Sequence, residues 1–206
     1  MAVLALVLLA AWLLLVAGLR TLLRLRLTGA AGVPRFRDRP GSPQWWARLL
    51  STLGFAGAVA APLAELAGLQ PIPILDRTPV RAAGVVLVVV GIAATLTAQL
   101  AMGASWRPDV DPDTRTALVT SGPFRLVRNP IFTATAATAA GLALLVPNPV
   151  AAAMLVAFVT ALQIQVRLVE EPYLHRVHAG AWERYAARTG RFLPWIGRHH
   201  PGPGSA

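Results

Sequence analysis

The first stretch whose residue types could do chemistry is SGPFRLVRNPIF, residues 121–132, directly before a long apolar run. A Gly-Pro pair near its start favours a turn. Asn129 is favoured as an N-cap and Pro130 at the first helical position, so we predict that a helix begins at Pro130. The free N–H groups of a helix N-terminus bind anions, and Arg128 beside them would strengthen the site for a carboxylate. The structural alternative is that Asn129 only caps the helix and Arg128 only holds a polar boundary.

A second polar stretch, QIQVRLVEE at residues 163–171, ends another apolar run. Gln163, Arg167 and the pair Glu170-Glu171 are spaced by three or four residues, so they share one face of a helix. Adjacent carboxylates at the end of an apolar helix are costly unless they are solvated, paired or used in chemistry. The alternative to a chemical role is an exposed ion-pair network of Arg167 with the two glutamates, which contributes little to stability.

A third stretch, LHRVHAGAWERY at residues 174–185, mixes basic and aromatic residues at helical spacing. Such a pattern is typical of an amphipathic helix at a membrane surface. His175 and His178 have no third ligand of suitable spacing, so no metal site is predicted.

These stretches must be positioned by an apolar framework, because the 206-residue chain is 55% hydrophobic and only 14% charged, with a mean hydropathy of +0.57. This composition is typical of membrane proteins. About 20 apolar residues span a bilayer, and five segments approach that length, at residues 2–19, 46–69, 80–103, 131–146 and 149–166. We therefore predict an all-α integral membrane protein with about five transmembrane helices. The chain has no cysteine, which excludes disulfides and thiolate chemistry.

The last two apolar segments are separated only by Pro147-Asn148-Pro149, a strong turn signal. We predict that they form a C-terminal helical hairpin, and one long kinked helix is the competing interpretation.

Arginine supplies all 19 basic residues and, with nine acidic residues, a net charge of +10. Seven arginines lie in 20–48, four in 104–129 and six in 167–198, whereas 70–81 holds two. With five spans and an external N-terminus, the three arginine-rich regions fall on the cytoplasmic side, as the positive-inside rule requires. The charge thus indicates membrane topology rather than nucleic-acid binding, and it predicts a cytoplasmic C-terminal segment. We expect the membrane to be a bacterial plasma membrane.

Other polar and aromatic residues near the predicted helix ends support this layout. The first apolar segment is followed, not preceded, by arginines, so we expect a retained helix rather than a cleaved signal peptide. Trp12, Trp45 and Trp46 are expected to be interfacial anchors. Glu65 lies near the outer end of its segment, where we expect solvation at the interface.

Taken in order, LVTSGPFRLVRNPIF, a hydrophobic hairpin and EEPYLHRVHAGAWERYAARTGRFLP resemble the isoprenylcysteine carboxyl methyltransferase family and its phospholipid methyltransferase relatives. That family carries Gly-Pro-aromatic…Arg-His-Pro-x-Tyr, a span, a Glu-Glu pair, an aromatic-Gly and a terminal Arg-Phe-x-Pro. The resemblance covers about 104–196. The positions that fit as they stand are Gly122, Pro123, Arg128, Pro130, Glu170, Glu171, Leu174, Tyr185, Arg191, Phe192 and Pro194. The departures are Asn129 for His, Phe132 for Tyr, His178-Ala179 for aromatic-Gly and Trp182 for Tyr.

The hydrophobic runs predict a single domain over 1–196 with three helices in 1–103, and the resemblance implies a cofactor-binding region in 104–196. The Pro- and Gly-rich composition of the chain end predicts a disordered tail at 197–206. The resemblance also implies S-adenosylmethionine as cofactor, although no Rossmann glycine fingerprint is present. Arg128 and the helix N-terminus would hold its carboxylate, Glu170 or Glu171 its ammonium or ribose, and Phe124, Leu126 and Val127 its adenine. The expected cofactor-binding residues are Gly122, Pro123, Leu126, Val127, Arg128, Asn129, Pro130, Phe132, Glu170 and Tyr185.

The implied reaction is methyl transfer to a lipophilic acceptor that arrives from the bilayer, most simply an isoprenoid- or lipid-linked carboxylate. Arg167 and Glu171 are the expected catalytic residues. Arg167 would orient an acidic acceptor, which is ionised at pH 7 and needs no base, whereas a glutamate could deprotonate an amine. The alternatives are a membrane sterol-type reductase that uses NADPH and a membrane protein without catalytic activity.

Overall fold

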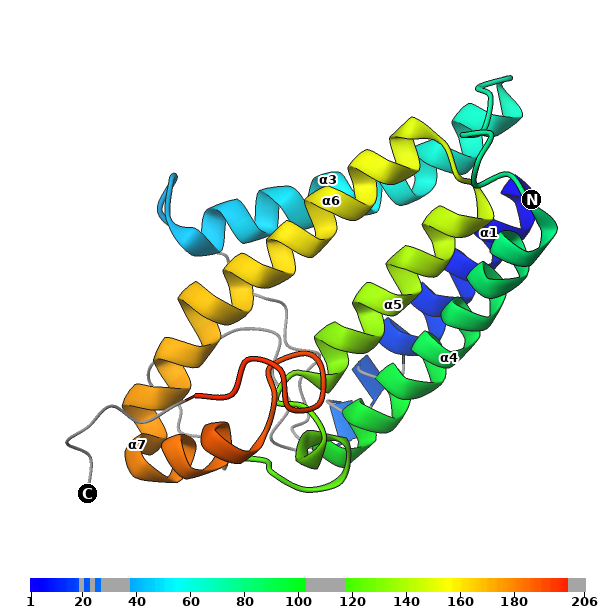
Figure 1. Cartoon of the computed structure of the whole chain (residues 1–206). Helices are drawn as coiled ribbons and strands as arrows, with labels where there is room; N and C mark the ends of the chain where they lie inside the picture. Colours follow the sequence, from blue (N-terminus) through cyan, green and yellow to red (C-terminus); the bar gives the residue numbers. More distant parts are fainter. Residues whose placement is uncertain (19–20, 23–24, 27–37, 103–117, 200–206) are drawn as a thin grey trace.

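The computed structural model describes residues 1–18, 21–22, 25–26, 38–102 and 118–199, and these residues form helices and loops without a strand. The helices are α1 (Ala2–Trp12), α3 (Pro43–Leu66), α4 (Thr78–Met102), α5 (Pro130–Leu145), α6 (Pro149–Ile164) and α7 (Glu171–Arg188) (Figure 1). Leu13–Ala17 and Gln165–Glu170 (η4) are π-helical, and Gly122–Arg125 is a 3₁₀ turn. Each predicted apolar segment is a helix, so the all-α prediction is confirmed. Of the predicted tail, 197–199 are described and 200–206 lie outside the described residues.

Among the described residues, three helical stretches are long and apolar enough to cross a membrane: α3, α4 and Pro149–Arg188, in which α6 runs through η4 into α7. The apolar helices Ala2–Val16 and α5 are shorter. At 1.5 Å per residue α5 is about 24 Å long, less than the roughly 30 Å of a hydrocarbon layer. A hydrocarbon layer of that thickness would therefore extend beyond α5 at one end or at both.

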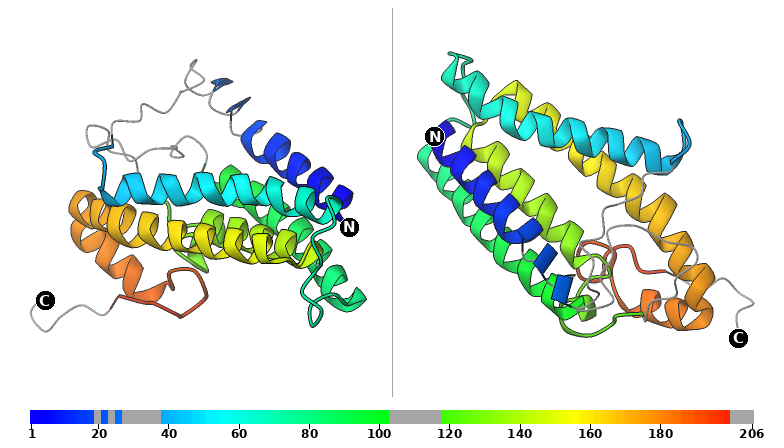
Figure 2. Two further views of the ribbon diagram at one scale, coloured as in Figure 1. Left: turned by 90° about the horizontal axis from the view of Figure 1, so that it is seen from above. Right: turned by 180° about the vertical axis from the view of Figure 1, so that it is seen from behind.

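The membrane helices pack as two antiparallel pairs, α4 with α5 and α3 with α6, and α1 lies along them (Figure 2). Glycine permits close approach in the first pair. A Cβ on Gly84 would lie 2.8 Å from the carbonyl oxygen of Gly141, and one on Gly91 would lie 2.9 Å from that of Ala134. Small residues are the usual means of close helix packing in membranes.

The hairpin prediction is confirmed, because α5 ends at Leu145 and α6 begins at Pro149. Asn148 is fully buried in the turn. Its Oδ1 accepts from the N–H of Ala151 at 3.0 Å and caps α6, while its Nδ2 donates to the carbonyl of Ala61 in α3 at 2.9 Å. One amide side chain thus fixes both the start of α6 and the neighbouring helix.

We expect Asn148→Ala to lower the free energy of unfolding by about 2 kcal/mol, since it removes a cap and a buried hydrogen bond. Asn148→Ser keeps a capping oxygen and should fall about halfway. Thermal unfolding in detergent measures both. Equal losses in the two variants would show that the cap contributes nothing.

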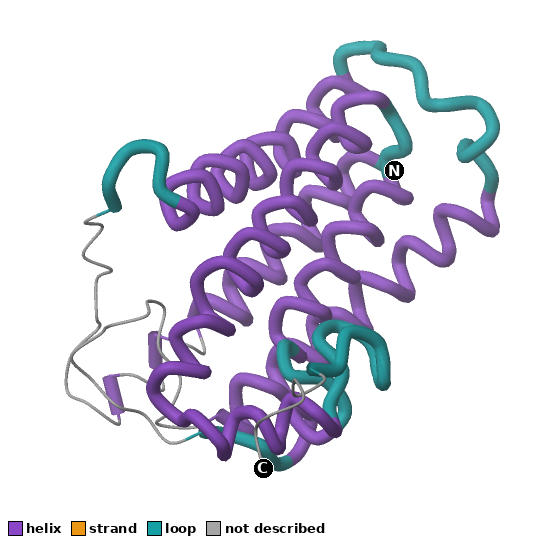
Figure 3. The backbone as a smooth tube through the Cα atoms, turned by 60° about the vertical axis from the view of Figure 1, so that its left-hand side comes forward, coloured by secondary structure: helices purple, strands orange, loops and turns teal. Residues whose placement is uncertain are grey.

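The helix ends sort the loops into two groups (Figures 1 and 3). Met1, residues 67–77 and the Pro147 turn lie at one end, which we call the turn end. The start of α5, the end of α4 and the C-terminal segment 189–199 lie at the other, which we call the site end. The described parts of the three arginine-rich regions share the site end, which is the grouping that the positive-inside argument requires.

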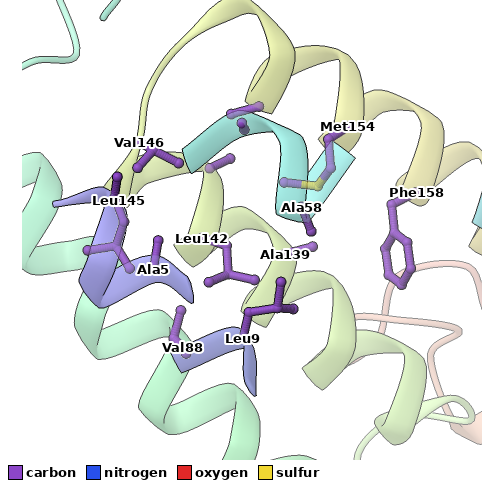
Figure 4. Packing of buried hydrophobic residues seen from close by; sticks show 14 of the residues in the cluster. Ala5, Leu9, Ala58, Val88, Ala139, Leu142, Leu145, Val146, Met154 and Phe158 are labelled. Atoms are coloured by element: carbon purple, nitrogen blue, oxygen red, sulfur yellow. The ribbon is translucent and has the colours of Figure 1, made fainter. Parts of the chain in front are cut away.

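The core holds α1 against the hairpin, with Leu9, Val88, Leu142 and Met154 among its buried side chains (Figure 4). Trp12 is also buried, with 8% of its surface exposed, and its ring centroid lies 5.9 Å from that of Phe55. The prediction that Trp12 anchors at the interface is therefore wrong, because α1 turns this face toward α3. Trp46 is exposed, as an interfacial residue should be.

Glu65 is also more enclosed than the sequence suggested. Its side chain is 17% exposed, and Oε1 lies 3.6 Å from the N-terminal amine of Met1. Simple interfacial solvation is therefore wrong for Glu65, because α1 brings a positive charge to the end of α3.

Candidate cofactor site

The site is built where two segments far apart in sequence run side by side. The N–H of Arg128 donates to the carbonyl of Gly190 at 2.8 Å, and the N–H of Asn129 donates to that of Arg191 at 3.2 Å. Thr133, in the first turn of α5, donates its hydroxyl to the carbonyl of Phe192 at 2.9 Å. The C-terminal segment 189–199 is therefore docked on the start of α5.

Turn chemistry shapes both segments. Gly122 has φ +57°, a left-handed conformation that favours glycine, and opens the 3₁₀ turn that buries Phe124. Tyr185 of α7 donates its hydroxyl to the carbonyl of Phe124 at 2.7 Å. Gly190 is needed on the other side, because a Cβ there would collide with the carbonyl of Leu193.

The side chain of Arg128 links the two segments through hydrogen bonds. This side chain is 3% exposed. Nε and Nη2 donate to Glu171 Oε1 at 3.1 and 2.7 Å, Nη1 donates to the carbonyls of Ala186 and Thr189, and Nη2 also donates to that of Gly197 at 3.0 Å. A guanidinium has five N–H donors, so all of them are used within the protein.

Glu171 is the acceptor at the centre of this network. Arg191 donates Nη2 to Oε2 at 2.7 Å and Nε to Oε1 at 2.9 Å, so the carboxylate receives two arginines. The apolar stretch of the long helix ends at Val166, and Glu171 lies past it. Burial alone would raise the pKa of Glu171, but the hydrogen bonds from Arg191 and Arg128 outweigh it and hold the pKa below its usual range.

The neighbouring Glu170, also past the apolar stretch, has a different environment. Its Oε1 accepts from Nε2 of Gln165 at 3.1 Å. Burial raises the pKa of this carboxyl to about 7, against the smaller opposing effects of that hydrogen bond. The two adjacent carboxyls thus differ in pKa: Glu171 stays an anion, whereas Glu170 can exchange a proton near neutral pH.

Among the described residues, no hydrogen bond or ion pair joins Arg167 to either glutamate. Arg167 is exposed and donates Nε to Gln163 Oε1 at 2.7 Å. The surface ion-pair network of Arg167 with the two glutamates, which was the alternative to a chemical role, is therefore not formed among the described residues. The reason is the π-helical stretch Gln165–Glu170, since a π turn closes on i→i+5 and rotates the following residues out of the expected i+3/i+4 face.

The comparison with known proteins agrees with this geometry. Residues 80–180 match the phospholipid methyltransferase family. This part of the chain belongs to that family. The resemblance seen in the sequence is confirmed, and no curated protein matches the chain.

The family region runs from the start of α4 into α7, so it contains the 121–132 stretch, the hairpin and both glutamates. Val127, Arg128, Asn129 and Pro130 are all buried there, while Leu126 is 65% exposed. Phe132 and Tyr185 are half-buried. The structure thus brings most of the expected cofactor-binding residues to the start of α5 and leaves the role of each as a prediction.

Asn129 departs from its predicted use. It occupies the N-cap position of α5, but its side chain makes no cap and Nδ2 donates to the carbonyl of Arg191 at 3.1 Å. Because the side chain of Asn129 bonds to the docked C-terminal segment, the first N–H groups of α5 have no side-chain cap. Sequence reasoning missed Arg191 as a site residue, although it stands in the Arg-Phe-x-Pro ending of the family pattern.

A kink in α7 lies at Ala179, the position at which the family pattern has the glycine of its aromatic-Gly pair. Ala179 has φ +40° and ψ −121° in the middle of this helix, a conformation that favours glycine. The family carries glycine at this place, where this chain has alanine. The kink turns Trp182 inward, where the Arg128 guanidinium lies 5.8 Å from its ring centroid.

We expect Ala179→Gly to raise the free energy of unfolding by about 1 kcal/mol, since it relieves a left-handed alanine. The matched control is Ala181→Gly, an exposed helical position two residues later, which should lose about 1 kcal/mol. Chemical unfolding of both variants measures the difference. A loss at both positions would mean that Ala179 is not strained.

Proposed function

We propose that the protein transfers a methyl group from S-adenosylmethionine to a lipophilic acceptor, an isoprenoid- or lipid-linked carboxylate, at the cytoplasmic membrane face. Membership of a methyltransferase family and the apolar helices support this function. The observation that carries it is the docking of segment 189–199 on the start of α5 through Arg128 and Glu171, because it gathers the family's polar residues at one place at the end of the membrane helices.

The residues at this place fit the amino-acid end of the cofactor. The uncapped N–H groups of α5 suit a carboxylate. Glu170 offers a carboxyl for an ammonium. Gln99 belongs to the buried residues of α4, is 4% exposed, and among the described residues its Oε1 has no hydrogen-bond partner, so it offers a further acceptor.

The bound cofactor would supply an electrophilic methyl group on a sulfonium. Displacement at that carbon needs alignment and exclusion of water more than acid–base catalysis. Arg167, which is exposed beyond the apolar stretch, would orient an acidic acceptor. Glu170, with a pKa near 7, would take the proton from an amine acceptor. Glu171, the other expected catalytic residue, holds Arg128 and Arg191 and so keeps the C-terminal segment in place.

Calorimetric binding of S-adenosylhomocysteine to the purified protein tests the proposal. Micromolar binding by wild type, lost in Glu170→Ala and kept in Arg176→Ala, an exposed change on α7, is the expected result. A folded protein that fails to bind it would remove the methyltransferase proposal. Binding of NADPH instead would favour the reductase alternative.

Binding should also depend on pH through Glu170. Its carboxyl is ionised above pH 7 and protonated below, so attraction for the ammonium of the ligand grows as pH rises through 7. We expect the affinity for S-adenosylhomocysteine to rise severalfold between pH 6 and pH 8, and Glu170→Gln to flatten the profile. A profile unchanged by Glu170→Gln would assign the titration to another group.

A further inference from the structure

The docked C-terminal segment contains a tight turn at residues 193–196, which we call the apolar turn. The N–H of Ile196 donates to the carbonyl of Leu193 at 3.2 Å, and the N–H of Arg191 donates to that of Ile196 at 2.8 Å. The turn also packs closely on Gly190, where a Cβ would lie 2.9 Å from the carbonyl oxygen of Ile196. The apolar turn is therefore a fixed part of the segment that is docked on α5.

The apolar turn presents large side chains to the outside of the protein. Leu193 is 53% exposed, Trp195 is 74% exposed and Ile196 is 64% exposed. Single exposed apolar residues are common, but several together on one surface mark a site of interaction. The side chains of this turn thus suit a partner outside the chain.

The backbone of Trp195 leads to the same inference. The turn has proline in its second position, and its third residue, Trp195, has φ +66°. A turn of this kind favours glycine in the third position, and a bulky residue there is strained. Because most of the ring is exposed, packing within the protein does not offset this strain. A strained residue that the fold itself does not need indicates a function.

The apolar turn lies at the level where the membrane helices end. Thr133, in the first turn of α5, donates to the carbonyl of Phe192, so the residue before the apolar turn lies beside the start of α5. α5 is shorter than a hydrocarbon layer, and apolar side chains beside its start would cover part of the difference. Segment 189–199 lies on the outside of the bundle, on the side away from α3 (Figures 1 and 2). The apolar turn can therefore reach the bilayer.

The charge around the apolar turn identifies the kind of lipid surface. Residues 118–199 contain eight arginines and three glutamates. Arg188 and Arg198, on either side of the docked segment, are exposed, and no ion pair joins either of them to another described residue. Anionic headgroups attract exposed arginines, and tryptophan is enriched where headgroups meet acyl chains. A second copy of the chain fits less well, because it would bring two basic surfaces together.

We propose that the apolar turn inserts into the interface of an anionic lipid leaflet, with Arg188 and Arg198 at the headgroup phosphates. Residues 190–192 are hydrogen-bonded to the start of α5. An inserted turn would therefore help to keep this segment docked at the candidate cofactor site. The proposal does not depend on methyl transfer.

A fluorescent label on the apolar turn measures the insertion directly. The chain has no cysteine, so Leu193→Cys can carry one environment-sensitive label on the full chain. The protein is placed as single copies in nanodiscs of phosphatidylcholine and phosphatidylglycerol, with nitroxide lipids that quench near the headgroups. Val156→Cys, exposed within α6, is the reference for lipid contact, and Arg176→Cys, exposed on α7, is the reference for water.

We expect the label at position 193 to be quenched at least about threefold more strongly than the label at position 176, because an interfacial apolar segment lies at the level of the nitroxide. Quenching equal to that at position 176, with equal access to aqueous iodide, would overturn the proposal. Shielding of position 193 that occurs only in discs with two copies would assign the apolar turn to a second copy instead.

Trp195→Gly separates insertion from a structural role, since glycine suits the positive φ. We expect quenching at position 193 to fall by about half, while hydrogen exchange of residues 189–199 in detergent stays as slow or becomes slower. Unchanged quenching would show that Trp195 is not the anchor. Faster exchange in detergent would show that its ring packs within the protein. Either result would overturn the proposal.

The arginines are tested by lipid charge. Discs with phosphatidylglycerol should give stronger quenching at position 193 than discs of phosphatidylcholine alone, and added salt should reduce the difference. Arg188→Gln combined with Arg198→Gln should abolish that difference. Equal quenching in the two kinds of disc with both arginines present would overturn the anionic part of the proposal.

Discussion

Replacing Arg128 with alanine should detach the C-terminal segment and abolish binding of S-adenosylhomocysteine. The change removes all five hydrogen bonds of the guanidinium and leaves part of the buried Glu171 charge uncompensated. Breaking a buried ion pair costs about 3–5 kcal/mol, so the unfolding temperature should fall sharply. Hydrogen exchange over residues 189–199 should lose its protection, which a purely chemical role for Arg128 would not produce.

Two variants bracket this result. Arg128→Lys keeps the charge but has three donors in place of a planar fork, so it should recover only part of the protection. Arg125→Ala, in the same stretch but exposed, should behave like wild type. Normal exchange protection in Arg128→Ala would show that other contacts dock the segment and that Arg128 is free for the cofactor.

The second large effect is a contrast between adjacent glutamates. Glu171→Gln weakens the acceptor for two arginines, and we expect it to lower the free energy of unfolding by about 3 kcal/mol. Glu170→Gln removes a carboxyl whose ionised form is disfavoured by burial, so stability at pH 8 should stay within about 0.5 kcal/mol or rise. Chemical unfolding at pH 8 compares the two.

A double-mutant cycle of Glu171→Gln with Arg191→Gln checks the cause. Residues in direct contact show coupling of about 0.5–3 kcal/mol, and we expect a value in this range. A larger loss from Glu170→Gln than from Glu171→Gln would contradict the assignment of the buried ion network to Glu171.

The sequence predicts the membrane architecture well, because each apolar run and the Pro147-Asn148-Pro149 turn act locally. Pro130 marks the start of α5 for the same reason. The family pattern also identifies the region of the site. These features depend on residues within one helix or one turn, where length and residue type decide the structure.

The partners of Arg128 and Asn129 could not be predicted, because they lie about 40 to 70 positions further along the chain. No neighbouring residue in the sequence indicates that Asn129 donates to the carbonyl of Arg191. The same is true of the bonds that Arg128 donates to Glu171 and three backbone carbonyls. The sequence also did not predict the π-helical stretch before Glu171. Because of that stretch, Arg167 and the glutamates do not share the helix face that an α-helix would give them. The inward face of Trp12 likewise follows from how α1 packs.

The partners of Arg128 also set the order in which the site can form during synthesis. Its side-chain contacts are with residues 171, 186, 189 and 197, all made later than Arg128 itself. α5 and α6 can therefore leave the ribosome while this guanidinium still lacks every native partner. Because an unpaired charge is costly in hydrocarbon, Arg128 must stay hydrated at the bilayer surface until then. The hydrophobic bundle is thus the early product of translation, and the polar centre closes last.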